Sequence, residues 1–229
     1  KLFQNREPRF YAWFSFDGGD YGTFLYNNQR PVYVNMLSCE GTATGFNPVS
    51  PREHCPTGIG TQKYIDPRAY VSTNGTENFY YPPIPLIRLA ELYLTLAECQ
   101  AELGNTKDAL DNVNIIRRRA GVTELTESMV QASGKSIVDW VRDERSAELF
   151  DELHRYFDVR RWCRGEECFG RGKRMGFNAE KANISFEEYN TLVEPQGVEL
   201  FKWDNRMYLY PITKKDLYAN PNCVQSPGY

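Results

Sequence analysis

Hydrophobic residues recur every three or four positions between residues 83 and 122, which is the spacing of one face of an α-helix. In the first part of this stretch, one stripe holds Leu86, Ala90, Tyr93, Ala97 and Ala101. Three of the five are alanines, and small side chains let a partner helix come close. Gly104 and Asn105 supply a helix end. We therefore predict a core-facing helix that stops at Gly104.

A second helix is predicted directly after this turn. Thr106 is its expected N-cap, because a threonine hydroxyl can accept hydrogen bonds from the first backbone N–H groups. Ala109, Val113 and Ile116 form its buried stripe, and Gly121 ends it. Two antiparallel helices with a short connection resemble one unit of a helical repeat. Such a unit cannot bury its faces alone and normally stacks on neighbours.

Residues 136–162 have the pattern of a third helix. Ser136 is the expected N-cap, and Ile137, Val141 and Phe150 mark the apolar face. The opposite face is dense in charge. The C-terminal part of the chain predicts a short extended segment, Met207–Ile212, followed by turns that contain proline.

The charged face of the third helix raises the question of catalysis. Glu144 and Glu148 lie four residues apart, so hydrolysis by paired carboxylates has to be considered. Arg142 and Arg145 alternate with them, and a carboxylate paired with arginine has too low a pKa to act as a general acid near neutrality. We interpret this face as a structural ion network and His154 as a partly exposed helix-end residue. No catalytic residue is predicted.

Residues 1–83 are rich in aromatic residues, Gly, Pro and Asn, and predict strands and long loops. The turn at residues 17–20 and the segment 24–26 favour a hairpin. More rings are present than two short strands can bury on one face. Exposed rings beside polar side chains are typical of sugar-binding surfaces, although a core made of rings is the alternative for each residue. The candidate ligand-binding residues are Trp13, Tyr21, Tyr26, Arg30 and Tyr33.

Composition excludes several classes of function. A net charge of -3 argues against binding of nucleic acid, and the basic run at residues 117–119 is interpreted as charge at the negative end of a helix dipole. The sequence has no run of 18 apolar residues, so no membrane span is predicted. Six cysteines and two histidines lack zinc-ligand spacing, so neither a metal nor a cofactor is predicted. Cys99 is expected to be buried, and Cys163 and Cys168 could close a small disulfide loop.

Four segments of the chain resemble the SusD/RagB family. They are NREPRF at residues 5–10, PLIRLAELYLTLAECQAELG with NVNIIRRRAGV within residues 85–122, VRDERSAELFDELHRYFDVRRW at residues 141–162, and YLYPITKKDLYANPNCVQSPGY at residues 208–229. The family consists of surface glycan-binding lipoproteins that accompany SusC-like TonB-dependent transporters in the outer membrane of Bacteroidetes. The similarity is to the C-terminal half of such proteins. One departure is Asp151-Glu152-Leu153, where the family usually has a glycine before its arginine.

The resemblance implies a mainly α fold of tetratricopeptide-like helical hairpins, with an irregular, loop-rich region that carries short strands. Residues 1–83 are then the ligand-facing region and residues 84–229 the helical region with an extended C-terminal tail. The implied function is capture of an oligosaccharide, without catalysis, for a transporter at the cell surface. The lipid anchor would lie outside this chain. Two alternatives remain: a glycoside hydrolase that uses two carboxylates among Asp17, Asp20, Glu144 and Glu148, and a helical-repeat module that binds only protein.

Overall fold

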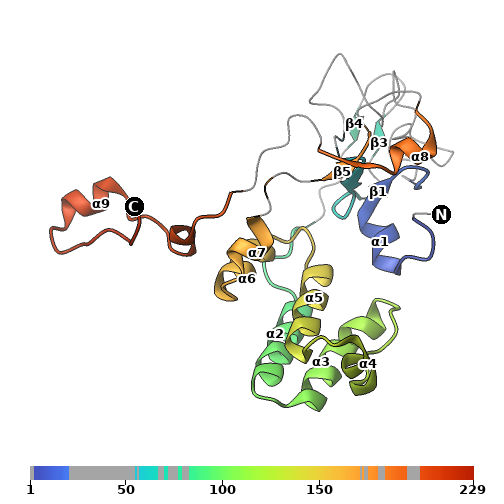
Figure 1. Cartoon of the computed structure of the whole chain (residues 1–229), viewed down its shortest axis with the longest axis horizontal. Helices are drawn as coiled ribbons and strands as arrows, with labels where there is room; N and C mark the ends of the chain where they lie inside the picture. Colours follow the sequence, from blue (N-terminus) through green and yellow to red (C-terminus); the bar gives the residue numbers. More distant parts are fainter. Residues whose placement is uncertain are drawn as a thin grey trace.

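The computed structural model describes residues 3–20, 55, 57–66, 70–71, 77–78, 83–170, 172, 175–179, 184–194 and 202–229. Within these residues the protein is mainly helical (Figure 1). The helices are α1 (Pro8–Trp13), α2 (Leu89–Glu102), α3 (Thr106–Arg119), α4 (Glu127–Ser133), α5 (Ile137–Glu148), α6 (His154–Arg161), α7 (Gly165–Phe169), α8 (Phe186–Tyr189) and α9 (Lys214–Ala219), with a 3-10 turn at Asn205–Tyr208. The strands form antiparallel pairs: β1 (Phe14–Phe16) with β2 (Ile59–Thr61), β3 (Tyr70–Val71) with β4 (Glu77–Asn78), and β5 (Gly176–Phe177) with β6 (Leu192–Val193).

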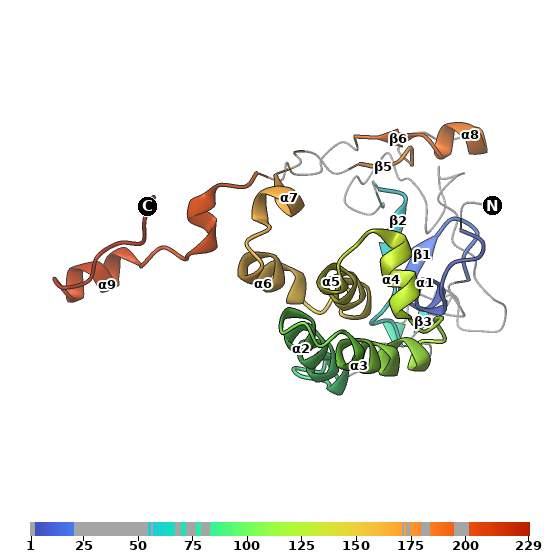
Figure 2. The same ribbon diagram turned by 60° about the horizontal axis from the view of Figure 1, so that its bottom comes forward.

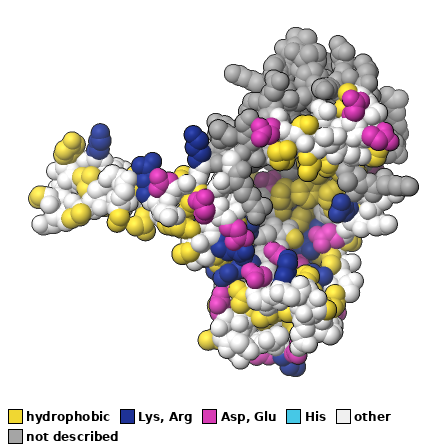
Figure 3. Space-filling view, in the orientation of Figure 1, with side chains coloured by type: hydrophobic (Ala, Val, Ile, Leu, Met, Phe, Trp, Pro, Cys, Tyr) yellow, Lys and Arg dark blue, Asp and Glu magenta, His cyan; other side chains and the backbone are white. Residues whose placement is uncertain are grey.

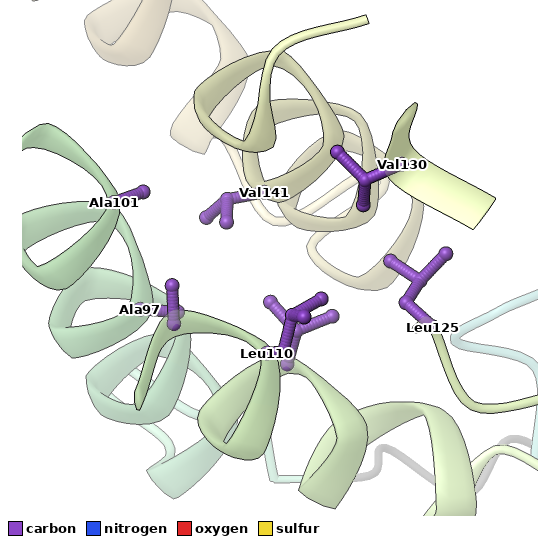
Figure 4. Packing of buried hydrophobic residues seen from close by; sticks show 8 residues of the cluster. Ala97, Ala101, Leu110, Leu125, Val130 and Val141 are labelled. Carbon is purple, nitrogen blue, oxygen red and sulfur yellow. The ribbon is translucent and has the colours of Figure 1, made fainter. Parts of the chain in front are cut away.

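The predicted helical hairpin is confirmed as α2 and α3, which lie side by side with α5 packed against both (Figure 2). Side chains with no exposed surface meet where the three helices join, among them Ala97, Ala109, Val113 and Val141. Val130 from α4 and Leu125 from the loop before it close one side of this core (Figure 4). The alanines permit the close approach of α2 and α3 that the sequence pattern indicated.

The turn between α2 and α3 follows the glycine prediction but not the predicted cap. Gly104 has a φ of 79°, and the backbone N–H of Asn105 donates to the carbonyl of Gln100 at 2.9 Å, which ends α2. Asn105, not Thr106, occupies the N-cap position of α3, and its side chain makes no capping hydrogen bond. The capping prediction for Thr106 is therefore wrong.

Helix α2 also begins later than predicted. Arg88 is its N-cap residue, with an extended backbone, so Leu86 lies outside the helix and is 91% exposed. The guanidinium of Arg88 binds Glu148 and Glu152, which fixes the chain in an extended conformation just before the helix.

The predicted third helix is two helices, α5 and α6. Ser136 caps α5 as predicted, since its hydroxyl accepts from the backbone N–H of Asp139 at 3.0 Å. The helix cannot continue to residue 162, because Asp151 and Leu153 adopt left-handed φ angles of 61° and 65°. Leu153 belongs to the segment Asp151-Glu152-Leu153, where the chain departs from the family's usual glycine, and its backbone has a left-handed conformation that glycine adopts more easily than other residues.

The part of the molecule around α1 and β1 is held together by aromatic rings from distant segments. Phe3, Phe10 and Phe16 contact one another, and Phe177 of β5 packs edge-on against Phe3. Tyr189 is fully buried and donates to the carbonyl of Gly58 at 2.8 Å. The turn at residues 17–20 is confirmed, but β1 pairs with β2; its predicted partner, residues 24–26, lies outside the described residues.

The C-terminal segment is anchored at its beginning and projects away from the helices beyond that point (Figure 1). Trp203 stacks on Phe169 of α7 with ring centroids 6.0 Å apart, and the hydroxyl of Tyr208 accepts from the backbone N–H of Gly165 at 2.9 Å. Because residues 205–208 form a 3-10 turn, the extended prediction is wrong for Met207 and Tyr208. No helix within the described ranges is long and apolar enough to cross a membrane.

The cysteine predictions are corrected. Cys163 and Cys168 are free thiols, and the backbone of Cys163 has a φ of 55° at the end of α6. Cys99 is exposed, not buried, because the buried apolar side of α2 consists of Ala90, Leu94, Ala97 and Ala101 and does not include it.

Candidate functional site

Trp13 is the one candidate ligand-binding residue that the structure describes; Tyr21, Tyr26, Arg30 and Tyr33 lie outside the described residues. Trp13 is the last residue of α1 and is half-buried. The ammonium of Lys63 lies 4.1 Å from the centre of its indole ring, and the guanidinium carbon of Arg9 lies 5.9 Å from it. The ring is therefore held in place by two cations.

A cleft of about 620 Å³ lies between the α1 segment and α5, and we call it the α1–α5 cleft. Its lining residues are Asn5, Arg6, Glu7, Arg9, Phe10, Trp13, Phe14, Asp143, Ser146, Ala147 and Phe150. Phe14 and Phe150 join its two walls, with ring centroids 4.4 Å apart. The space-filling view shows hydrophobic side chains in a hollow between the lower helices and the part that carries α1 and β1 (Figure 3). The cleft thus combines aromatic rings with polar residues from both walls.

Helix α1 is fixed to α5 by a buried arginine. Arg9 is 5% exposed, and its guanidinium donates to Glu144 at 2.8 Å and to Glu148 at 3.1 Å. It also donates twice to Glu7, at 2.8 and 2.9 Å. Burial alone lowers the pKa of Arg9, but the hydrogen bonds to Glu7 and the charge of Glu144 outweigh it and raise the pKa, so Arg9 stays charged.

The predicted ion network on α5 is confirmed, and its members come from most of the chain. Glu144 accepts from Arg117 at 2.5 Å, in addition to Arg9. Glu148 has no exposed surface and binds Arg88 at 2.6 Å as well as Arg119. The basic residues at the end of α3 thus complement the helix dipole, as expected, and also neutralise the carboxylates of α5.

The predicted partners of these glutamates are wrong. Arg145 binds Asp158 of α6 at 2.7 Å, and Arg142 binds Glu102 of α2 at 2.9 Å. Residues next to a glutamate in a helix point to other sides of it, so Arg142 and Arg145 reach other helices. The partners of Glu144 and Glu148 instead come from α1, α3 and the start of α2, and no local pattern in the sequence marks them.

Glu152 extends the network to the loop after β2. Its carboxylate binds Arg88 at 2.6 Å and Lys63 at 2.5 Å. Burial would raise the pKa of Glu152, but the hydrogen bonds from Arg88 and Lys63 lower it overall. The pKa of Lys63 is lowered by burial, and Glu152 opposes that effect. Lys63 therefore fixes the indole of Trp13 to the end of α5, a role that sequence reasoning missed.

The arrangement fits binding better than catalysis. Both oxygens of Glu144 and of Glu148 face guanidinium groups, and both side chains are buried. His154 begins α6, with its Nε2 3.7 Å from Glu91, as the helix-end interpretation predicted. Within the described ranges, no three His, Cys, Asp or Glu side chains are grouped to hold a metal ion. What remains in the α1–α5 cleft are ring faces and hydrogen-bonding groups.

A second pocket of about 590 Å³ adjoins the cleft and shares Ser146 and Phe150 with it. Its other lining residues are Arg145, Leu149, Asp151, Leu153, His154, Arg155, Tyr156, Asp158 and Phe169. The sequence pattern assigned Phe150 to the core-facing stripe of one long helix. The end of α5 instead places it at the border of two concave surfaces.

Residues 1–229 match the sequence model of the SusD family along their whole length. The chain belongs to the SusD family. SusD-like protein P25 of Formosa agariphila is 35% identical over 141 residues, which are 62% of this chain and 23% of that protein. SusD-like protein P2 of the same organism is 27% identical over 178 residues, 73% of this chain and 30% of that protein.

Solved structures agree with this assignment. The protein BT4246 is 46% identical and superposes with a TM-score of 0.87 over 98% of this chain and 36% of its own. A SusD-like protein, BF3747, from Bacteroides fragilis is 28% identical, with a TM-score of 0.76 over 100% of this chain and 40% of its own. The family resemblance and the SusD-like, mainly α fold are thus confirmed. The chain spans 23% to 40% of the length of these relatives.

Proposed function

We propose that this chain is part of a SusD-type protein that binds an oligosaccharide without acting on it, and that the ligand occupies the α1–α5 cleft. The observation that carries this proposal is the place of Trp13, an anchored ring in a cleft that also offers polar side chains. A sugar ring presents apolar C–H faces to aromatic rings and hydroxyls to polar groups, so a cleft of this composition suits it. Membership of the SusD family supports the same class of ligand.

The division of the chain stays part of this proposal. Residues 1–83, together with the wall of the cleft that α5 supplies, form the ligand-facing side, and the rest of residues 84–229 form the scaffold. Tyr21, Tyr26, Arg30 and Tyr33 remain candidates for further ligand contacts. By family resemblance, the complete protein sits on the outer membrane, held by a lipid anchor outside this chain, and delivers its ligand to a SusC-like TonB-dependent transporter.

The hydrolase alternative loses half of its candidate carboxylates. Glu144 and Glu148 are saturated by arginines and buried, so they cannot approach a glycosidic bond. Only Asp17 and Asp20 at the turn after β1 remain for that hypothesis. The α2–α3 hairpin favours the other alternative, a module that binds protein only, and the experiment below separates all three.

The test is a glycan-array screen of the protein, followed by calorimetry on each glycan bound and by product analysis of the same mixtures. Trp13→Ala is expected to weaken binding about fivefold or more, since loss of one stacking ring removes roughly 1 kcal/mol. Tyr218→Ala is the matched control, because Tyr218 lies in the projecting tail and is 86% exposed. Tyr21→Ala belongs in the same series.

Trp13→Phe separates loss of the ligand contact from loss of folding, because it keeps an aromatic ring beside Lys63 and Arg9. Its affinity is expected to lie between those of the native protein and Trp13→Ala, with all three folded by circular dichroism. Equal affinities of the native and Trp13→Ala proteins would place the ligand elsewhere. Product formation would favour the hydrolase, and transporter binding with no glycan bound would favour the protein-binding module.

A further inference from the structure

The turn between α5 and α6 holds a leucine in an unfavourable conformation and outside the core. Leu153 has a φ of 65°, which the Cβ atom of an ordinary residue disfavours, and its side chain is 82% exposed. The strained backbone lowers stability, and the exposed side chain adds no core packing in return. Backbone strain of this kind is concentrated at ligand sites. The surface that Leu153 lines is therefore a candidate for ligand contact.

That surface is the second pocket, of about 590 Å³, which we call the α5–α6 pocket. Its volume lies in the range of pockets that hold small organic ligands. Beside Leu153, its apolar lining includes three rings: Phe150 from the turn after α5, Tyr156 from α6 and Phe169 from α7. The pocket therefore has ring faces on several sides.

Two of these rings are held by groups that do not line the pocket. Phe169 stacks on Trp203 with ring centroids 6.0 Å apart. The guanidinium carbon of Arg160 lies 4.5 Å from the centre of the Tyr156 ring. Rings that are already fixed lose little conformational freedom when a ligand binds, which favours affinity. The α5–α6 pocket is therefore preorganised.

Polar side chains of both signs accompany the rings. Asp151 and Arg155 line the α5–α6 pocket and are exposed. The hydroxyl of Thr61 donates to the carboxylate of Asp151 at 3.1 Å, and Arg155 donates to the hydroxyl of Ser146 at 2.7 Å. Both charged groups are thus oriented. Ring faces beside oriented donors and acceptors suit the C–H faces and hydroxyls of a sugar.

The α5–α6 pocket adjoins the α1–α5 cleft. Ser146 and Phe150 line both surfaces. The ring of Phe150 also contacts Phe14 on the opposite wall of the cleft, with centroids 4.4 Å apart. A ligand that follows the cleft as far as Phe150 therefore reaches the edge of the pocket.

We propose that the α5–α6 pocket is a second subsite for one oligosaccharide, which occupies the α1–α5 cleft, passes Phe150 and contacts Leu153. This inference rests on the proposed function and narrows its ligand to linear oligosaccharides long enough to occupy both surfaces. A chain held at both surfaces gains affinity, because the second contact is intramolecular once the first has formed. Leu153 is then a residue that determines specificity for ligand length.

The experiment is a length series measured by calorimetry with the complete protein. The probes are xylo-, manno-, malto- and galacturono-oligosaccharides, from disaccharide to octasaccharide. A disaccharide occupies one surface only, whereas an octasaccharide can occupy both. In the series that binds, affinity is expected to rise about tenfold or more from the shortest to the longest member.

Leu153→Gly is the decisive variant, because it should weaken binding without weakening the fold. Octasaccharide affinity is expected to fall about fivefold or more through loss of apolar contact with the ligand. The unfolding midpoint in urea should not fall, because the left-handed backbone suits glycine. Leu92→Ala is the matched control: Leu92 is also an exposed leucine, it lines neither surface, and its loss should leave affinity unchanged.

Trp13→Ala completes the test, because Trp13 lines the cleft and not the pocket. Loss of octasaccharide affinity in both Trp13→Ala and Leu153→Gly supports the proposal, since a ligand confined to one surface responds to one of them. Loss with Trp13→Ala alone would overturn this inference and leave the proposed function in place. Loss with Leu153→Gly alone would overturn the assignment of the cleft and, with it, the ligand that spans both surfaces. No binding in any series would overturn both proposals.

Discussion

Helix α5 takes part in two buried clusters of opposite chemistry, and each holds a different part of the molecule. Val141 belongs to the apolar core that it shares with α2, α3 and α4, all within residues 89–148. Glu144 and Glu148 belong to the ionic cluster, which also includes Arg9 and the arginines at the start of α2 and the end of α3. The apolar core joins helices that are close in sequence, whereas the ionic cluster attaches the distant α1 segment and the wall of the cleft.

The two clusters also differ in how they respond to damage. Loss of a methyl group from an apolar core costs free energy in proportion to the cavity left. Removal of one member of a buried ion cluster leaves charges without partners, and that penalty is larger than the stabilisation an intact pair provides. The ionic cluster is therefore the more fragile of the two for single substitutions.

The largest effect is expected for Glu148→Ala. It removes the carboxylate that faces Arg9, Arg88 and Arg119, so the free energy of unfolding should fall by about 3 to 5 kcal/mol in urea titrations. Glu102→Ala is the matched control, because its pair with Arg142 is exposed, and it should cost less than about 1 kcal/mol. Similar costs for the two variants would contradict the difference between buried and exposed pairs.

A smaller effect is expected in the apolar part. Leu94 has no exposed surface and lies in a neighbouring apolar cluster with Ala90, Ile116 and Leu149. Leu94→Ala should lower the free energy of unfolding by about 3 kcal/mol through lost burial and an internal cavity. Leu92, two residues away on the exposed side of α2, is 55% exposed, and Leu92→Ala should change stability by less than about 0.5 kcal/mol. If Leu92→Ala is as damaging as Leu94→Ala in this chain, both sides of α2 are buried, which would contradict this expectation.

The turn between α5 and α6 offers a stabilising change. Leu153 has a φ of 65° and a side chain that is 82% exposed, so Leu153→Gly relieves backbone strain without loss of core contacts. We expect a gain of roughly 0.5 to 1 kcal/mol in thermal or urea unfolding. Leu153→Ala keeps the Cβ atom and should not produce this gain, which separates backbone strain from exposure of the leucine.

The smallest expected effect is a pH dependence of stability that the ionic cluster should show and the apolar core should not. The folded-state pKa of Glu152 lies below its ordinary value of 4.5, so the stability it contributes is present above that pH and is lost as the pH falls through the lowered pKa. The stability difference between the native protein and Glu152→Gln should therefore shrink below about pH 4.5. The stability difference between the native protein and Leu94→Ala does not involve Glu152, so it should not shrink in this way as the pH falls. Urea titrations from pH 7 to pH 3 measure both.

The contrast also explains what the sequence could and could not predict. The alanine stripe of α2, the glycine at residue 104 and the serine cap at residue 136 are local signals, since each depends on neighbours within a few residues. The start of α2 could not be found in this way, because Arg88 is held extended by glutamates about 60 residues away along the chain. The break after α5 was missed for the same reason: Lys63 and Tyr64 bind the carbonyls of Phe150 and Asp151.

The candidate site, too, could be predicted only where the signal was local. Aromatic composition made Trp13 a candidate, and Trp13 lines the α1–α5 cleft. Composition could not reveal that Lys63 would lie on its ring or that Phe150 would form the opposite wall, because these residues come from three separate segments of the chain. Sites assembled from distant loops leave little local pattern to find.

The contact between Gly165 and Trp203 has a consequence for sequence variation in the family. A Cβ atom at residue 165, the first residue of α7, would overlap the indole of Trp203. While residue 203 is tryptophan, residue 165 therefore has to be glycine. Two positions 38 apart are thereby tied to each other. In related sequences that have a residue other than glycine at position 165, we expect a residue smaller than tryptophan at position 203.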